Sequence, residues 1–224
     1  MDLNKAISQL QSKRRLNDHS LIRRMKHEIL TKEQVAIVLG QWFHPLHYFP
    51  SFVSRYIGIC QDMPTKTLMS KIVWQELGEG DVKRAHETIF IDTMTGVGFE
   101  KEALDAAEAF PATARLVAEY RAKSANDHLA SLGYVYATES ADLLMVSAIG
   151  TAVRGATGIK RLPWVDIHII QEPDHNDSVD GAVSMSYSDS ENEQILAAAD
   201  AMFDCWCNFF SEIEMAIGEL KAAA

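Results

Sequence analysis

Helical periodicity runs through almost the whole chain, and this feature restricts its fold most strongly. Apolar residues recur at helical spacing in long segments, whereas the period-two alternation of a half-buried strand is absent over any useful length. Hairpin dipeptides such as Asn-Gly do not separate apolar runs. No internal repeat or linker divides the 224 residues. We therefore predict one all-α domain over residues 1–224, with about seven or eight helices.

Local signals in the first half predict several helix boundaries. Residues 4–30 are expected to form one or two helices, broken near Asn17. Thr31 and Gln34 form a capping box that begins the next helix, which two prolines, Pro45 and Pro50, should kink or interrupt. The subsequent helices are predicted over 66–77, ending at Gly78 and Gly80, and from a cap at Asp81 to about residue 93.

Beyond Pro111 the pattern predicts four more helices. They are expected over about 112–137, over 139–154 with an end at Gly155 and Gly158, after Pro163, and over 192–220. A polar stretch at 176–192 should separate the last two.

Charge and composition exclude several classes of function. The chain carries a formal charge of −10, yet its first 32 residues hold eight Lys/Arg against three Asp/Glu. The acidic remainder would repel a polyanion, so we expect no nucleic-acid partner. No apolar run reaches the roughly 18–20 residues of a membrane helix, and the first residues lack the apolar segment of a signal peptide. We expect a cytoplasmic protein that has no membrane partner, with its three cysteines as free thiols.

The most informative segment contains His168, Glu172 and His175. At 100° per residue these three side chains fall within about 60° of one another, on one stripe of a helix. Imidazole and carboxylate groups at this spacing, among apolar neighbours, suit a transition-metal site. Buried histidines are also commonly hydrogen-bonded core residues, so the stripe by itself leaves both interpretations open.

Two further segments carry candidate ligands. Glu76 and Glu79 lie at the end of one helix and His86 lies beyond a glycine turn, and the spacing does not choose between the two glutamates. Glu139 stands among small residues in an otherwise apolar helix, where it can point inward. Together these carboxylates and imidazoles match the inward-facing sets of dimetal-carboxylate helical bundles, although the Glu-x-x-His pairs of ferritin-like proteins are absent.

The order of these motifs resembles the haem-oxygenase-like diiron oxidases. It comprises Glu-Leu-Gly-x-Gly-Asp to Ala-His over 76–86, an isolated Glu139, and His-x-x-x-Glu-x-x-His over 168–175. The resemblance implies a haem-oxygenase-like bundle of about seven helices. It also implies six metal ligands: Glu76, His86, Glu139, His168, Glu172 and His175.

The chain departs from that family's pattern at three points. Glu172 stands where the family more often has Asp, and Pro173 lies within the motif. An additional N-terminal carboxylate ligand, found in some members, has no evident equivalent in residues 41–55.

By the same resemblance we expect an enzyme in which two Fe(II) ions activate O₂ to oxidise a small molecule. An amino acid or a fatty-acid-like compound is the expected substrate, with desaturation, C–C cleavage or N-oxygenation as the outcome. We consider His47 and Arg154 as substrate-binding residues, the latter because a guanidinium can bind a carboxylate in bidentate fashion. An external reductant and a homodimer are compatible with this prediction.

Two other classes of function compete with it. A metal-free, thiaminase-type hydrolase on the same fold would need a positioned cysteine nucleophile, for which Cys60, Cys205 and Cys207 are the only candidates. A non-enzymatic helical binding module would instead carry the Glu and His residues as a solvated acidic patch.

Overall fold

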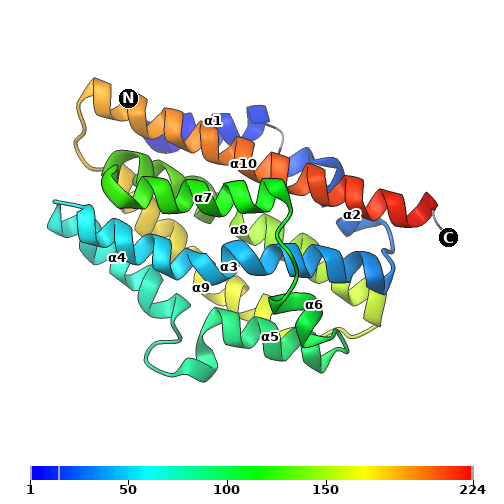
Figure 1. Ribbon diagram of the computed structural model, residues 1–224. Helices are drawn as coiled ribbons and strands as arrows, with labels where there is room; N and C mark the ends of the chain where they lie inside the picture. The colour runs from blue at the N-terminus through cyan, green and yellow to red at the C-terminus, as the bar shows by residue number, and fades with distance from the viewer. Residues whose placement is uncertain (1, 15, 223–224) are drawn as a thin grey trace.

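The computed structural model describes residues 2–14 and 16–222, and all regular structure in that part of the chain is helical (Figure 1). The α-helices are α1 (Leu3–Arg14), α2 (Ser20–His27), α3 (Lys32–Ile59), α4 (Met63–Glu76), α5 (His86–Gly96), α6 (Lys101–Asp105), α7 (Pro111–Asn126), α8 (His128–Thr157), α9 (Pro163–Val183) and α10 (Asp189–Ala222). Two 3₁₀ turns, η1 (Leu16–Asp18) and η2 (Val82–Arg84), complete this part. The all-α prediction is confirmed, with more short helices than predicted.

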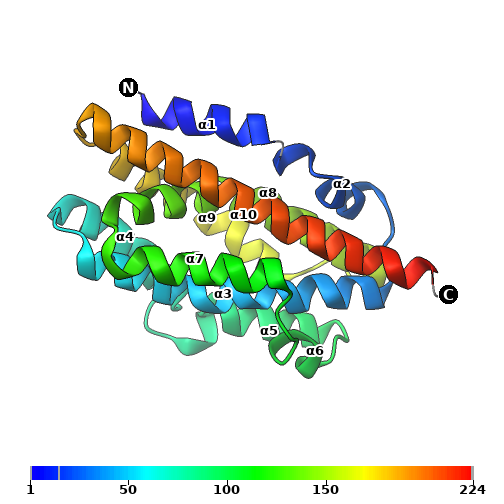
Figure 2. The same ribbon diagram turned by 45° about the horizontal axis from the view of Figure 1, so that its top comes forward.

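Helix α8 forms the centre of the bundle. It packs against α10, α9, α3, α2 and α7, and residues 129–139 are buried without a break. A helix that is buried on all sides must be in the interior. Figure 2 shows α1 and α2 lying along α10 on the outside. Helix α9 packs against both α8 and α4.

Several helix ends agree with the sequence signals. The Thr31–Gln34 capping box is present at the start of α3, and the N-terminal region is broken at η1 as expected. Gly158 closes α8 in the left-handed conformation, with φ of 72°, as its position predicted.

Other predicted boundaries are wrong. Helix α3 continues through Pro45 and Pro50, because packing against α7, α8, α6 and α4 along its length outweighs the lost hydrogen bonds. The helix predicted over 112–137 is divided at Asp127, whose side chain accepts a hydrogen bond from the backbone N–H of Ala130 and starts α8. Residues 128–157 then form one helix instead of two halves. Helix α9 extends to Val183, well into the predicted break.

The close contact between α8 and α10 depends on Gly133. A Cβ atom at this position would clash with the carbonyl oxygen of Ile195 and would lie 2.9 Å from the Cβ of Ala198. Gly155 lies on the same helix, where a Cβ would meet nothing within 4 Å. A comparison of alanine substitutions at these two positions therefore separates the effect of packing from the effect of helix propensity.

We predict opposite effects of alanine at these two positions. Gly133→Ala should lower the free energy of unfolding by about 1–3 kcal/mol, because α10 must move away from α8. Gly155→Ala should leave it unchanged or raise it by up to about 1 kcal/mol, since alanine favours a helix. Urea unfolding followed by circular dichroism measures both changes; equal effects would contradict the proposed packing role of Gly133.

Candidate metal centre

Four helices bring carboxylates and imidazoles to one buried point. Each of the six predicted ligands is at most 6% exposed, and all six gather inside the bundle. They come from the end of α4 (Glu76), the start of α5 (His86), the middle of α8 (Glu139), and α9 (His168, Glu172 and His175). This burial distinguishes the cluster from a solvated acidic patch.

A tight turn positions Glu76 against His86. Gly78, Glu79 and Gly80 all have positive φ, and a side chain at Gly78 would clash with the Asp81 carbonyl. The sequence predicted that Asp81 caps the helix that runs to about residue 93, but Asp81 caps the short turn η2 instead, and α5 begins only at His86. The turn brings Nδ1 of His86 to 3.0 Å from Oε1 of Glu76.

The same turn decides between the two glutamates that the sequence left open. Glu79 points away and forms an ion pair of 2.6 Å with Arg84, which is mostly exposed. Glu76 is therefore the carboxylate that joins the cluster.

The first half of the cluster, which we call triad A, consists of Glu76, His86 and His168. The rings of His86 and His168 have centroids 4.7 Å apart. Nε2 of His86 lies 2.7 Å from Oε1 of Gln171, and Nδ1 of His168 lies 2.8 Å from the carbonyl oxygen of Trp164. Because both oxygens are acceptors, the facing ring nitrogens carry hydrogen, and the other nitrogen of each ring is directed to the cluster.

The second half, triad B, consists of Glu139, Glu172 and His175. Nδ1 of His175 is 3.1 Å from Oε2 of Glu139 and 3.8 Å from Oε2 of Glu172. Asn176 donates a hydrogen bond of 3.3 Å to Oε1 of Glu172. One ligand atom from each member of triad B lies within 4.8 Å of the others, a group that could hold a metal ion.

Burial and mutual proximity shift the pKa values of triad A. Burial, together with the nearby His86, lowers the pKa of His168 to about 3, so this imidazole is neutral. Burial alone would raise the pKa of Glu76, but the charge and hydrogen bond of His86 dominate and lower it to about 2. Burial opposes the positive charge on His86, yet Glu76 raises its pKa above the usual value.

In triad B the pKa shifts favour the protonated forms of the side chains. Burial would lower the pKa of His175, but the carboxylate of Glu139 outweighs it and raises the value to about 9. Burial also raises the pKa of Glu172 well above its ordinary range, with Asp142 and Glu139 adding to the effect. The metal-free cluster is therefore held together partly by protons.

Two residues in the site were missed by the sequence analysis. Asp142 follows Glu139 by one helical turn, and its Oδ2 atom is 3.8 Å from Nε2 of His168. Gln171, which lies within the His168–His175 motif, orients His86. The Glu-x-x-Asp spacing on one helix face could have pointed to Asp142, whereas no sequence signal distinguishes Gln171.

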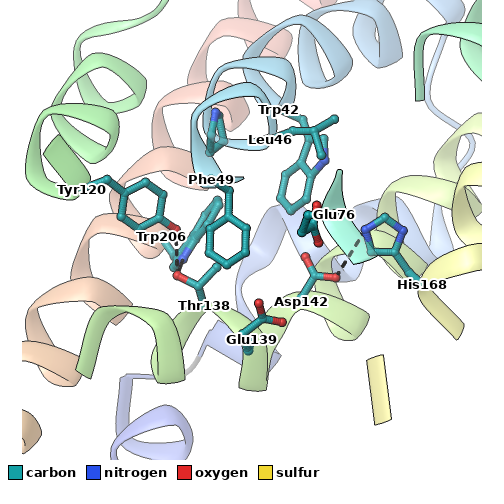
Figure 3. A pocket seen from close by; sticks show the side chains of 11 residues that line it. Trp42, Leu46, Phe49, Glu76, Tyr120, Thr138, Glu139, Asp142, His168 and Trp206 are labelled. Carbon is teal, nitrogen blue, oxygen red and sulfur yellow. Dashed lines mark hydrogen bonds and ion pairs between the residues drawn. The ribbon is translucent and has the colours of Figure 1, made fainter. Parts of the chain in front are cut away.

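A small cavity borders the cluster (Figure 3). Its volume is about 30 Å³, enough for one or two water-sized molecules. Thr138 accepts hydrogen bonds from Trp206 at 3.3 Å and is bonded to the hydroxyl of Tyr120 at 2.7 Å. The cavity is lined by Trp42, Pro45, Leu46, Phe49, Glu76, Tyr120, Thr138, Glu139, Asp142, His168 and Trp206, so within the described part of the chain no Lys or Arg faces it.

The two predicted substrate-binding residues do not reach this cavity. His47 is on the surface and its Nδ1 pairs with Glu87 at 2.8 Å. Nε of Arg154 donates a hydrogen bond of 2.9 Å to the carbonyl of Lys160, near the end of α8. His47 lies on the exposed face of α3 and Arg154 near the end of α8, so a contact of either residue with substrate stays a prediction.

Comparisons with known proteins place this chain in a family. The model of a family described as iron-containing redox enzyme matches residues 36–207, which include all six predicted ligands. This chain belongs to that family. The description of this family agrees with the class of activity predicted from the sequence.

Individual relatives support the fold. A curated 4-chloro-allylglycine synthase from Streptantibioticus cattleyicolor is 24% identical over 170 residues, which cover 75% of this chain but 65% of that protein, less than two thirds of its length. A CADD-like protein of unknown function from Nostoc punctiforme superimposes with a TM-score of 0.81 at 16% identity, covering 97% of this chain and 99% of that chain.

A second solved structure identifies the fold. A domain of unknown function with a haem oxygenase-like fold, from Shewanella denitrificans, superimposes with a TM-score of 0.77 at 15% identity. The match covers 99% of this chain and 94% of that chain. The predicted haem-oxygenase-like fold is confirmed. No described helix has both the length and the apolar character needed to cross a membrane.

The residues of the cluster fit iron. Imidazole and carboxylate donors are the set that non-haem iron prefers. Three of the buried atoms, Nε2 of His175, Oε1 of Glu139 and Oδ2 of Asp142, have no hydrogen-bond partner. Buried polar atoms are rarely left unpaired, so these atoms are available as ligands.

The raised pKa of His175 predicts a pH-dependent stability of the metal-free protein. Protonated His175 stabilises the fold fully below its ordinary value of 6.5, and this contribution is lost as the pH rises towards about 9. Relative to His175→Gln, the wild type should lose roughly 3 kcal/mol of unfolding free energy over that interval.

Chemical unfolding in the presence of a chelator measures this difference, with the exposed-site variant His27→Gln as the control. Parallel pH profiles for the wild type and His175→Gln would contradict the assignment of a proton to His175.

Proposed function

We propose that this protein is a non-haem diiron enzyme that uses O₂ to oxidise a small organic molecule. The observation that carries the proposal is the buried pair of triads, which offers three imidazoles and three carboxylates from four helices. Membership of an iron-containing redox family supports iron as the metal. Burying so many ionisable groups is costly unless they are paired with one another or coordinate a metal ion.

In this proposal each triad holds one iron ion. Glu76, His86 and His168 bind the first, and Glu139, Glu172 and His175 bind the second. Two ferrous ions would supply the electrons that activate O₂. Gln171 and the Trp164 carbonyl fix the ring orientations of His86 and His168, which keeps the coordinating nitrogens directed to the metal.

The apolar wall of the cavity would control what meets the metal centre. Trp42, Leu46 and Phe49 on α3 cover the cluster, and they exclude bulk water from it. Since the cavity volume is about 30 Å³, a substrate must be accompanied by movement of these side chains. Nε1 of Trp42 is buried without a hydrogen-bond partner and offers a donor to a bound molecule.

The relative from Streptantibioticus, a 4-chloro-allylglycine synthase, supports an amino acid as the substrate. The cavity constrains how such a substrate would bind. With no Lys or Arg among the lining residues in the described part of the chain, a substrate carboxylate would have to bind an iron ion directly. A fatty-acid-like substrate would meet the same condition and would place its chain along the aromatic wall.

The metal-free hydrolase finds less support. No cysteine lines the cavity that borders the cluster. Burial raises the pKa of Cys205 to about 11 and also raises that of Cys207, which disfavours the reactive thiolate. Cys60 lies in a separate cavity beside Tyr187.

Iron binding provides the main test. Anaerobic titration of the metal-free protein with Fe(II) should give close to two ions per chain, and mixing with O₂ should consume O₂. His168→Ala and His175→Ala should each lose about one ion per chain while the helical circular dichroism is retained. His27→Ala, an exposed control, should bind as the wild type does. Full stoichiometry in both cluster variants would refute the proposed ligand sets.

The two glutamates near the glycine turn provide a matched pair. Glu76→Gln should weaken Fe(II) binding by at least about 10-fold, because it removes a buried anionic donor. Glu79→Gln lies three residues away but loses only its surface ion pair with Arg84, so its affinity should be unchanged. Isothermal titration calorimetry measures the Fe(II) affinity of both variants. An equal loss of affinity in the two would show that the turn does not select Glu76 as the ligand.

A further inference from the structure

We propose that Asp142 is a seventh ligand of the metal centre, a carboxylate from α8 that joins the two triads. The inference rests on the proposed diiron function. Asp142 lies one helical turn after Glu139, so both carboxylates project from the same face of α8. Figure 3 shows its carboxylate between Glu139 and His168 at the edge of the cavity.

Asp142 lies between the two triads. Its Oδ2 atom is 3.8 Å from Nε2 of His168 in triad A, and it follows Glu139 of triad B by one helical turn. Its carboxylate is therefore placed between the two proposed ligand sets.

The contact between Asp142 and His168 brings two electron-rich atoms together, which favours a cation between them. Because Nδ1 of His168 donates to the Trp164 carbonyl, the neutral ring presents the lone pair of Nε2 to Asp142. Oδ2 of Asp142 is buried and has no hydrogen-bond donor. Nitrogen and oxygen ligands each sit about 2.0–2.2 Å from a first-row metal ion, so one ion can bind both of these atoms.

Among the described residues that line the cavity, only Asp142 is available as an additional carboxylate ligand. Helix α3 contributes only Trp42, Pro45, Leu46 and Phe49 to the cavity, and none of these is a carboxylate. The lining residues that carry a carboxylate are Glu76, Glu139 and Asp142, and the first two already belong to triads.

Charge balance favours the same assignment. The triads contain three carboxylates and three neutral imidazoles, which leave two ferrous ions with one uncompensated positive charge. Asp142 supplies the fourth negative charge and makes the buried centre neutral. An uncompensated charge in a protein interior is strongly unfavourable, so the extra carboxylate should raise metal affinity.

Manganese provides a probe that does not depend on activity. Metal-free wild type, Asp142→Asn and Asp142→Glu should be titrated with Mn(II), with Asp166→Asn as the control because that aspartate lies on α9 with a half-exposed side chain that faces Arg161. We expect Asp142→Asn to bind one of the two Mn(II) ions at least about 10-fold more weakly, and Asp142→Glu to recover part of the loss. A crystal structure of the Mn(II)-loaded wild type should show a bond from Asp142 to the metal.

The outcomes separate this inference from the proposed function. Two tightly bound Mn(II) ions in both the wild type and Asp142→Asn, or a loaded structure without a metal–Asp142 bond, would overturn the role of Asp142 alone. Failure of the wild type to bind Mn(II) and Fe(II) would overturn the diiron function and this assignment with it.

Discussion

The rest of the structure depends on the burial of six ionisable side chains at one point in a helical bundle, with the partly buried Asp142 beside them. Charged groups lose much of their hydration in such a place, and the loss must be offset by partners. Here the partners are one another: Glu76 faces His86, and Glu139 faces His175. Opposite pKa shifts within one cluster, down for Glu76 and up for His175, show how strongly these groups interact.

Helix α8 makes this burial possible. Because α8 is enclosed by its neighbours, a carboxylate on this helix lies in the interior of the bundle. Gly133 lets α10 approach closely, and the small residues Ala137 and Ala141, both buried, flank Glu139 on the chain. Helices α4, α5 and α9 then surround the cluster from the other side. Such rigid elements can hold ligands more accurately than loops can.

The likeness to solved structures shows that this architecture tolerates wide changes in sequence. A TM-score of 0.81 at 16% identity means that the helices are arranged alike although most side chains differ. A shared fold carries no particular activity, so the function has to be argued from the site. In this chain the argument lies in the two triads, the apolar wall on α3, and the absence of a basic side chain among the described cavity residues.

The sequence by itself determined what depends on neighbours along the chain. Helical periodicity puts His168, Glu172 and His175 on one stripe, and the Thr31–Gln34 cap starts α3, because both effects act within one or two turns. Only the tertiary structure selected Glu76 over Glu79, brought Asp142 to His168, and left His47 and Arg154 outside the cavity. These outcomes depend on the direction of a turn and on how distant helices pack, and local spacing does not encode either of them.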